Sequence, residues 1–316
     1  MISRRVEAWH FPPGGPEAIL IGGPTASGKS AVALSLAERL GGAVINADSM
    51  QLYRELRVLT ARPTEADERR APHRLYGIVP ASEAFSVGRW FDAAKGAIAA
   101  ARGEGRVPVL VGGTGLYFKV LLEGLAPVPD IPAELRAHWR EKSDRLGAEA
   151  LHRELASRDP GMAMKLKKSD PQRIVRALEV IDATGVSLSE WQGTPAAPVL
   201  DPGSVLRLVV APEREPLYAA IDTRFDRMVE AGAIEEVEAL LALDLDDSLP
   251  AMRAYGVREL RAYLAGASSL GEAMAKAKTE SRRYAKRQMT WARRYMADWE
   301  WFPGPARAID AVALTP

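Results

Sequence analysis

Residues 18–30 read Ala-Ile-Leu-Ile-Gly-Gly-Pro-Thr-Ala-Ser-Gly-Lys-Ser, and this stretch decides the fold. It begins as an apolar run typical of a buried strand, continues as the motif Gly23-x4-Gly28-Lys29-Ser30, and is followed by an amphipathic segment, residues 31–40. The two glycines let successive backbone N–H groups turn inward, while the helix N-terminus and Lys29 add positive charge. The motif therefore predicts a phosphate-binding loop for a di- or triphosphate, with the Ser30 hydroxyl near a Mg2+ that bridges phosphate oxygens.

The composition is that of an ordinary soluble globular protein. Of 316 residues, 47% are hydrophobic and 26% are charged, enough to bury a core in one large domain or two modest ones. Lysine and arginine number 42 against 41 acidic residues, so the net charge of +1 argues neither for nor against a nucleic-acid partner. The chain has no cysteine, which excludes disulfides, catalytic thiols and cysteine-bound zinc and fits a reducing cytoplasm. Because there is no apolar run of 18 residues and no signal-peptide pattern in residues 1–17, we expect no membrane segment and a cytoplasmic location.

Three further apolar runs predict the other strands of a parallel sheet. Residues 43–47, 107–111 and 205–210 are short and apolar, and helical patterns such as residues 87–102 separate them. The predicted fold class is α/β, a P-loop NTPase-like core with a parallel sheet. Asp48 directly follows the first of these runs. Since ligands bind at the carboxyl edge of such sheets, we expect Asp48 beside the phosphate loop, as a reacting group, a helix cap or a group that orients Mg2+.

The run at 107–111 lacks an acidic residue where hydrolytic P-loop enzymes carry one. It ends in Gly112-Gly-Thr-Gly115, whereas a motor or signalling NTPase is expected to place an aspartate there to hold the metal for hydrolysis. The sequence thus has a phosphate loop but no obvious residue that would activate a water molecule. This favours a transferase that holds a phosphate compound while another group attacks it.

A change in amino-acid composition at Ala126 predicts an inserted domain. A proline-rich linker leads into a segment, residues 133–191, that is helical in pattern and rich in lysine and arginine, and prolines between 195 and 202 close it. Such a basic segment is either a solvated face or a binding face. The predicted parts are an N-terminal extension over residues 1–17, a P-loop α/β core over 18–128 and 200–316, and a small all-helical insertion domain over 129–199.

The last long helical pattern, residues 270–299, combines cations with aromatic residues. One of its faces, which we interpret as core rather than as a platform for stacked bases, carries Tyr284, Gln288, Trp291, Tyr295 and Trp299. Lysine and arginine residues occupy the rest of the helix. They are typical of a surface that follows a phosphate backbone, and a solvated surface is the alternative.

Five separated motifs occur in order between about residues 18 and 302. They are Gly23-Pro-Thr-Ala-Ser-Gly-Lys-Ser30, Asp48-Ser-Met-Gln51 with Tyr53-Arg54, Val111-Gly-Gly-Thr-Gly-Leu-Tyr117, Asp170-Pro-Gln-Arg-Ile-Val-Arg-Ala-Leu-Glu179 and Lys286-Arg-Gln-Met-Thr-Trp291. Together they closely resemble the tRNA dimethylallyltransferase family. The resemblance implies an enzyme that transfers the dimethylallyl group of dimethylallyl diphosphate to the N6 amine of adenosine 37, just 3′ of the anticodon in tRNA, and releases diphosphate.

The resemblance implies roles for residues at the edge of the predicted sheet. Asp48 is the expected general base, which removes a proton from the amine as the C–N bond forms, and Thr114 is expected to bond near the amine or the diphosphate bridge. Ser30 is the expected ligand of Mg2+, the cofactor, which together with Lys29 would neutralise the charge that grows as the allylic C–O bond breaks. The residues expected to bind the diphosphate are Gly23, Thr25, Ala26, Ser27, Gly28, Lys29, Ser30 and Arg224.

The resemblance also implies residues that contact the anticodon stem-loop of tRNA. Because a stacked base cannot reach a buried site, the target adenosine must be flipped out, and Ser49 and Gln51 would hold it. We expect the protein to be a monomer and not to bind a membrane. The expected tRNA-binding residues are Asp48, Ser49, Met50, Gln51, Thr114, Arg136, Gln172, Arg173, Ile174, Val175, Arg176, Arg253, Arg258, Lys286 and Arg287.

The sequence departs from the usual family pattern in three places. The family commonly has Gly-Thr-Ala-Lys-Pro-Thr and His-His-Leu-Ile-Asp, where this chain has Leu59-Thr-Ala-Arg62-Pro-Thr64 and His73-Arg-Leu-Tyr-Gly77. The usual Ile-Gly-Tyr of a later turn is replaced by Tyr255-Gly256-Val257. These changes leave the residues of the chemistry intact and bear on tRNA contact.

Three other functions fit parts of the pattern. A small-molecule kinase of the shikimate or nucleoside kinase type shares the phosphate loop, but it uses ATP and has no need of two basic helical regions. An enzyme that prenylates free AMP, ADP or ATP shares the chemistry, yet a mononucleotide has few phosphates to meet residues 170–179 and the cationic last helix. An RNA-binding protein that keeps a phosphate loop without catalytic function would not need Asp48 and Thr114 at the sheet edge.

Overall fold

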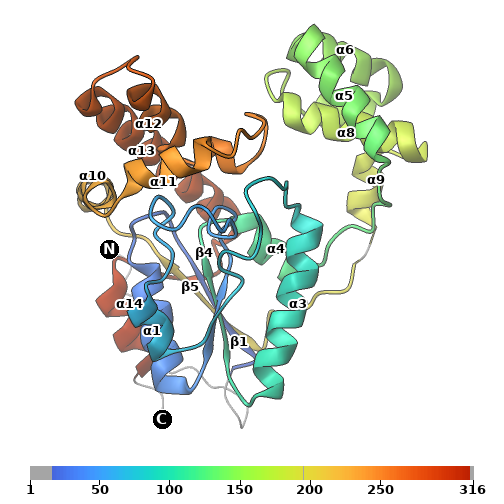
Figure 1. Ribbon diagram of the computed structural model, residues 1–316. Helices are drawn as coiled ribbons and strands as arrows, with labels where there is room; N and C mark the ends of the chain where they lie inside the picture. The colour runs from blue at the N-terminus through green and yellow to red at the C-terminus, as the bar shows by residue number, and fades with distance from the viewer. Residues whose placement is uncertain (1–15, 195, 314–316) are drawn as a thin grey trace. The chain divides into compact units, whose positions relative to one another are not determined.

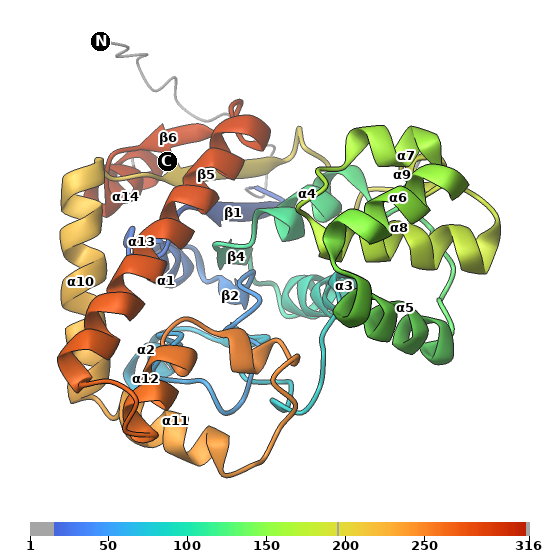
Figure 2. The same cartoon turned by 90° about the horizontal axis from the view of Figure 1, so that it is seen from above.

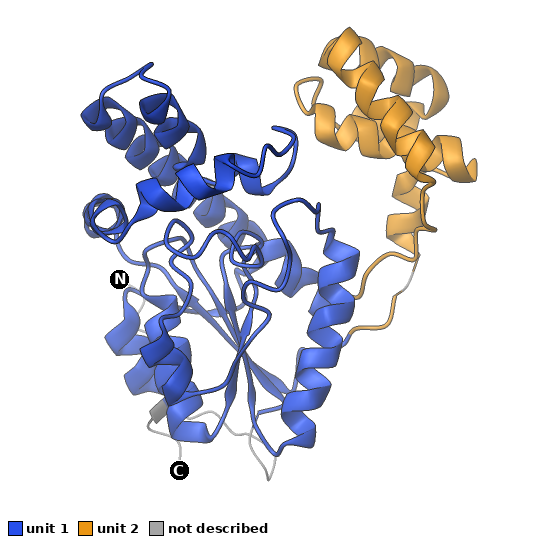
Figure 3. Ribbon diagram, in the orientation of Figure 1, with its two compact units in different colours: residues 1–122, 199–316 blue, residues 123–198 orange. Residues whose placement is uncertain are grey.

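The computed structural model describes residues 16–194 and 196–313, so nearly all of the predicted N-terminal extension lies outside the described residues. The chain forms two compact units, one made of Met1–Leu122 and Val199–Pro316 and the other of Glu123–Pro198 (Figure 3). The first unit carries the sheet and the phosphate loop, and the second is helical. In chain order, the helical unit therefore interrupts the α/β unit.

A parallel sheet forms the centre of the first unit (Figure 1). Within the described residues it has six strands in the order β3-β2-β4-β1-β5-β6, and neighbouring strands are parallel. The four apolar runs predicted from sequence form the four inner strands, and the α/β fold class is confirmed. The edge strands β3 and β6 are too short to show an apolar period and are not predicted. The strands are β1 (Ala18–Gly22), β2 (Ala43–Asn46), β3 (His73–Arg74), β4 (Pro108–Gly112), β5 (Val205–Val210) and β6 (Glu300–Phe302).

Helices cover both faces of this sheet (Figure 1). On one face, α1 (Lys29–Leu40) and α14 (Pro305–Ala313) bury Val32 and Ala308 in a core shared with β1 and β5. On the other face, α3 (Val87–Gly103) buries Trp90 completely, and its indole N–H donates to the carbonyl of Asn46 at 3.1 Å. Residues of β1, β2 and β4 are buried throughout, so the carboxyl ends of these strands are held firmly.

Helices α10 (Arg214–Glu230) and α13 (Leu270–Tyr295) run side by side (Figure 2). Ion pairs of 2.6 Å join Lys278 to Asp226 and Arg282 to Asp222. Helix α13 ends four residues before the predicted boundary, because the chain must turn to bring β6 beside β5. Among the helices of the described residues, none is both long and apolar enough to cross a bilayer. The remaining helices of this unit are α2 (Glu65–Arg70), α4 (Gly115–Glu123), α11 (Ala233–Leu241), the 3-10 helix η1 (Ala251–Arg253) and α12 (Val257–Leu264).

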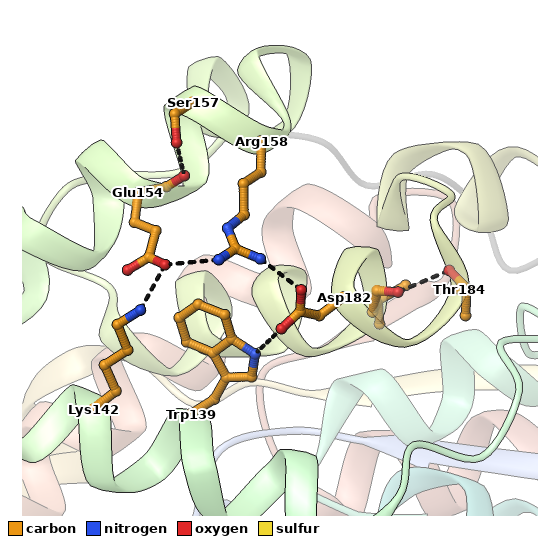
Figure 4. Close-up of polar contacts among 8 residues, drawn as sticks. Trp139, Lys142, Glu154, Ser157, Arg158, Asp182 and Thr184 are labelled. Atoms are coloured by element: carbon orange, nitrogen blue, oxygen red, sulfur yellow. Dashed lines mark hydrogen bonds and ion pairs between the residues drawn. The ribbon is translucent and has the colours of Figure 1, made fainter.

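The second unit has a hydrophobic core of its own, formed by residues that include Trp139, Leu151 and Ile174. Polar groups fix the tryptophan at the edge of this core (Figure 4). Its indole N–H donates to Asp182 at 3.0 Å, and Arg158 links Asp182 to Glu154. The unit thus combines apolar packing with a connected series of ion pairs. Its helices are α5 (Ala133–Leu146), α6 (Ala148–Arg158), α7 (Pro160–Lys165), α8 (Pro171–Thr184) and α9 (Leu188–Gly193).

Candidate active site

The phosphate loop follows β1 and leads into α1, as the motif predicts. Gly23 (φ 153°) and Gly28 (φ 84°) adopt conformations that favour glycine, and a Cβ at Gly23 would overlap the carbonyl oxygen of Val210. Lys29 is the first residue of α1, and its ammonium donates to the carbonyl of Pro24 at 3.1 Å, so the side chain folds back over the loop. A helix N-terminus and a cation are therefore presented at the same place.

The loop forms one wall of a cavity of about 680 Å³. The other walls come from the turn after β2, from the segment at 59–61 and from α10 and α13. All but one of the residues predicted to bind diphosphate line this cavity, and the exception, Gly23, lines a neighbouring one. The predicted site residues that line it are Thr25, Ala26, Ser27, Gly28, Lys29, Ser30, Asp48, Met50, Gln51 and Arg224.

Lys29, Arg224 and the Asp48 carboxylate interact electrostatically in this cavity. Burial lowers the pKa of the Lys29 ammonium to about 8; the Asp48 carboxylate opposes this shift, and the Arg224 guanidinium adds to it. Burial also lowers the pKa of Arg224, and Asp48 again opposes the shift. Arg227 also lines the cavity, so three cations and one carboxylate give its lining an excess of positive charge suited to an anionic ligand.

Arg224 links the phosphate loop to the opposite wall of the cavity. Its Nη1 donates to the Thr25 hydroxyl at 3.0 Å, and its Nη2 donates to the Thr60 carbonyl at 3.2 Å. Its Nε is buried and has no hydrogen-bond partner among the described residues. The side chain is thus fixed between the two walls through its terminal nitrogens, while its buried Nε–H stays unpaired.

Asp48 lies in a turn after β2, and since the next helix begins only at α2, the helix-cap alternative is wrong. Its Oδ1 accepts the Met50 N–H at 3.0 Å, and its own N–H donates to the Asn46 side chain at 2.8 Å. The neighbouring Ser49 N–H donates to the Thr114 hydroxyl at 3.0 Å. These bonds fix the carboxylate at the carboxyl edge of the sheet and bring Thr114 beside the same turn.

Thr114 itself lines a second cavity of about 290 Å³, together with Gly23, Tyr284 and Gln288. The glycine-rich loop that carries it approaches its neighbours so closely that side chains have no room. A Cβ at Gly112 would overlap the Ala47 carbonyl, one at Gly113 the Gln288 amide, and one at Gly115 the Trp291 ring. Tyr284 of α13 lines both cavities, so the two are neighbours.

Gln288 connects the phosphate loop to the glycine-rich loop, a role that the sequence analysis does not predict. Its Oε1 accepts the Thr25 N–H at 2.8 Å, and its Nε2 donates to the Gly113 carbonyl at 3.1 Å. The side chain is buried. A lone amide on an otherwise aromatic helix face is the signal that could have identified it.

The interpretation of that face as core is wrong for Tyr295, which is 41% exposed.

The remaining predicted tRNA-binding residues of the first unit lie on its surface or at cavity walls. The Gln51 side chain donates to the carbonyls of Thr60 at 2.9 Å and Ala61 at 3.1 Å. Arg287 donates to the Tyr255 hydroxyl at 2.6 Å. The other members of the set are exposed: Arg253, Arg258 and Lys286.

The second unit carries six of the predicted tRNA-binding residues, and five of them have accessible side chains. Arg136, Gln172 and Arg173 are exposed, and Val175 and Arg176 are half-buried. Ile174 requires a correction. Its position on α8 points into the hydrophobic core, where its side chain is completely buried, so that side chain cannot contact tRNA.

Part of the positive charge of α13 is neutralised by neighbouring carboxylates. Besides the two ion pairs with α10, Arg283 pairs with Glu280 at 2.6 Å. Lys286, Arg293 and Arg294 are exposed. The positive surface of α13 therefore lies toward its C-terminal half.

Ser30 provides an oxygen donor for a metal, because it is in the first turn of α1 and lines the large cavity. Mg2+ bound to phosphates usually takes only one or two ligands from the protein and the others from phosphate and water, so a single hydroxyl beside a phosphate loop fits this donor set. Among the described residues, no three or more His, Cys, Asp or Glu side chains are grouped to hold a metal ion.

Comparisons with known proteins agree on one family. The sequence model of IPP transferase matches residues 51–295, and that of isopentenyl transferase matches residues 16–82. A tRNA dimethylallyltransferase of Rhodopseudomonas palustris (strain BisB18) is 53% identical over 293 residues, which cover 93% of this chain and 92% of the relative. The crystal structure of a tRNA isopentenylpyrophosphate transferase from Bacillus halodurans is similar with a TM-score of 0.65 and 36% identity, over 90% of this chain and 89% of that one. A eukaryotic dimethylallyltransferase acting on tRNA is similar with a TM-score of 0.76 and 27% identity, over 87% of this chain and 69% of that one.

Proposed function

The chain belongs to the IPP transferase family, and from this premise we propose that it transfers the dimethylallyl group of dimethylallyl diphosphate to N6 of adenosine 37 in tRNA. In this reaction the allylic C–O bond breaks, a C–N bond forms, and diphosphate and one proton leave. The family predicted from the five sequence motifs is confirmed, and the chain is a transferase.

One observation carries the proposal for the donor: the phosphate loop, Lys29 and Arg224 line a single cavity that also contains Asp48. Two cations and the loop N–H groups favour binding of a diphosphate and stabilise the charge that it gains as the C–O bond breaks. A bound Mg2+, held by Ser30, would supply further positive charge to the leaving group.

Asp48 is the group proposed to accept the proton from N6. The bonds with Asn46 and Met50 hold its turn, so the position of the carboxylate near the phosphate loop is fixed. Adenine N6 is a weak nucleophile, and removal of its proton as the bond forms makes attack easier. Thr114, bonded to the Ser49 N–H, is proposed to orient the amine or the bridging oxygen.

Accessible cations on both units support the proposal that tRNA is the acceptor. Arg173 on α8 and Lys286 on α13 are exposed, as phosphate-backbone contacts require. We propose that the chain acts in the cytoplasm as a monomer. Light scattering on the free protein tests the oligomeric state.

The test of the function is a transfer assay with two acceptors. The protein is incubated with Mg2+, labelled dimethylallyl diphosphate and either unmodified tRNA containing A36-A37 or free AMP. Label that enters tRNA and is lost when A37 is replaced supports the proposal. Label only in AMP would assign the chain to mononucleotide prenylation, and phosphate transfer from ATP with no label in either acceptor would identify a kinase.

A further inference from the structure

A carboxylate on α11 holds one wall of the large cavity. Glu236 Oε2 accepts the N–H groups of Arg57 at 2.7 Å and Val58 at 2.6 Å, and Oε1 accepts the Leu59 N–H at 2.9 Å. Three successive N–H groups that converge on one anion form a nest, which here is filled by a side chain 177–179 positions away in the chain.

The two residues that follow this nest hold two side chains of the candidate site. The Thr60 carbonyl accepts hydrogen bonds from Arg224 and from Gln51, at 3.2 and 2.9 Å, and the Ala61 carbonyl accepts a second bond from Gln51. Ala61 is in the left-handed region at φ 48°, and its N–H donates to the Val58 carbonyl at 2.9 Å. Because the turn is this tight, a displacement of residues 57–59 also displaces the two carbonyls.

We propose that Glu236 is a positioning residue for the diphosphate site: it fixes residues 57–59, and thereby the Thr60 carbonyl that directs Arg224 toward the phosphate loop. The identity of the bound diphosphate as part of a prenyl donor rests on the function proposed above. Arg224 spans the cavity between the Thr60 carbonyl and the Thr25 hydroxyl, so one of its two anchors depends on Glu236.

The chemistry of the carboxylate explains why this position matters. A glutamine at 236 has the same shape but one acceptor oxygen, and its NH2 group would face a backbone N–H. At least one of the three N–H groups then loses its partner, and residues 57–59 relax away from α11. The long Arg224 side chain, with its anchor displaced, samples other rotamers and must be ordered again when an anion binds.

The test is the binding of inorganic pyrophosphate with Mg2+, measured by isothermal titration calorimetry. Glu236→Gln should weaken binding by up to about tenfold, in line with the cost of ordering one long side chain when the anion binds. Glu236→Asp keeps the charge but withdraws it from the nest, so it should weaken binding too. Glu238→Gln, an exposed change on the same helix, is the matched control and should leave the affinity within about twofold.

The route through Arg224 is tested in an Arg224→Ala background, where Glu236→Gln should change pyrophosphate affinity by less than about twofold. Thermal unfolding of each variant verifies that it is folded. The proposal is overturned if Glu236→Gln and Glu238→Gln bind alike, or if the full weakening persists without Arg224. A wild-type protein that binds pyrophosphate but transfers nothing to tRNA would instead overturn the proposed reaction and leave the role of Glu236 standing.

Discussion

Gly113 is predicted to tolerate no side chain, because the Gln288 amide occupies the place where a Cβ would lie. Its φ is outside the left-handed region, so Gly113→Ala adds steric overlap without strain in the backbone conformation. The new Cβ would overlap Nε2 of Gln288 and lie 3.2 Å from Cδ of that side chain and 3.3 Å from Oδ2 of Asp48. The amide must therefore move away from the glycine-rich loop.

The cost of this movement follows from the bonds that Gln288 makes. Moving the amide breaks its 2.8 Å bond from the Thr25 N–H and its 3.1 Å bond to the Gly113 carbonyl. An unpaired buried group costs about 1–3 kcal/mol, so with two bonds broken we expect the free energy of unfolding to fall by about 2–6 kcal/mol in urea denaturation. Transfer activity should also fall, since Thr25 belongs to the phosphate loop. Gly96→Ala is the control: it lies inside α3 with no atom within 4 Å of its Cβ, and should stabilise the protein by up to about 1 kcal/mol.

A double-mutant cycle separates this explanation from a general intolerance of the loop. In a Gln288→Ala background the overlapping group is gone, and Gly113→Ala should then cost less than about 0.5 kcal/mol. If Gly113→Ala lowers the free energy of unfolding equally in both backgrounds, overlap with Gln288 is not the cause, and the reasoning is refuted.

Three further predictions concern charged residues, two in the candidate site and one on the second unit. Asp48→Ala should slow single-turnover transfer by about 10²- to 10⁴-fold while pyrophosphate and tRNA affinities change only a few-fold; loss of tRNA binding would instead indicate a structural role. Because burial lowers the pKa of Lys29 to about 8, the ammonium is lost as the pH rises through that value, and pyrophosphate affinity should then fall by up to about tenfold per pH unit. A Lys29→Met variant should lack this dependence, and parallel pH profiles of the two proteins would contradict the prediction. Arg173→Ala should raise the Kd for tRNA and leave pyrophosphate binding unchanged; an unaltered Kd would remove Arg173 from the interface.

The inner strands and the phosphate loop are predictable from sequence because their signals are local. Four apolar runs and one glycine-lysine motif are each complete within a few residues, and buried parallel strands need no other signal. The edge strands β3 and β6 contain two and three residues and exist only through pairing with β2 and β5. The end of α13 likewise depends on tertiary contacts, since β6 must begin soon after it.

Lys29 and Asp48 are predictable because local motifs place them just after β1 and β2, whereas Arg224 lies within α10 and is expected only from the resemblance to the family. Gln288 and Glu236 are missed for a physical reason: each binds backbone groups that are distant in the chain, 263 positions away for Thr25 and 177–179 for the nest. Backbone N–H and C=O groups are the same at every residue, so the sequence carries no mark of which ones a side chain will meet.

Two departures from the family pattern, Arg62 and Gly77, are separated in the sequence but lie against each other in the structure. Gly77 has φ 59°, and a Cβ there would overlap the Arg62 guanidinium, so the absence of a side chain at 77 makes room for the larger cation at 62. The guanidinium donates to the Arg54 carbonyl at 3.2 Å, and its pKa is lowered by its partial burial and then by Arg57. Arg62 follows directly after the two carbonyls, at 60 and 61, that hold the site side chains. In this chain Arg62 and Gly77 therefore pack together at the segment whose Thr60 carbonyl accepts from Arg224.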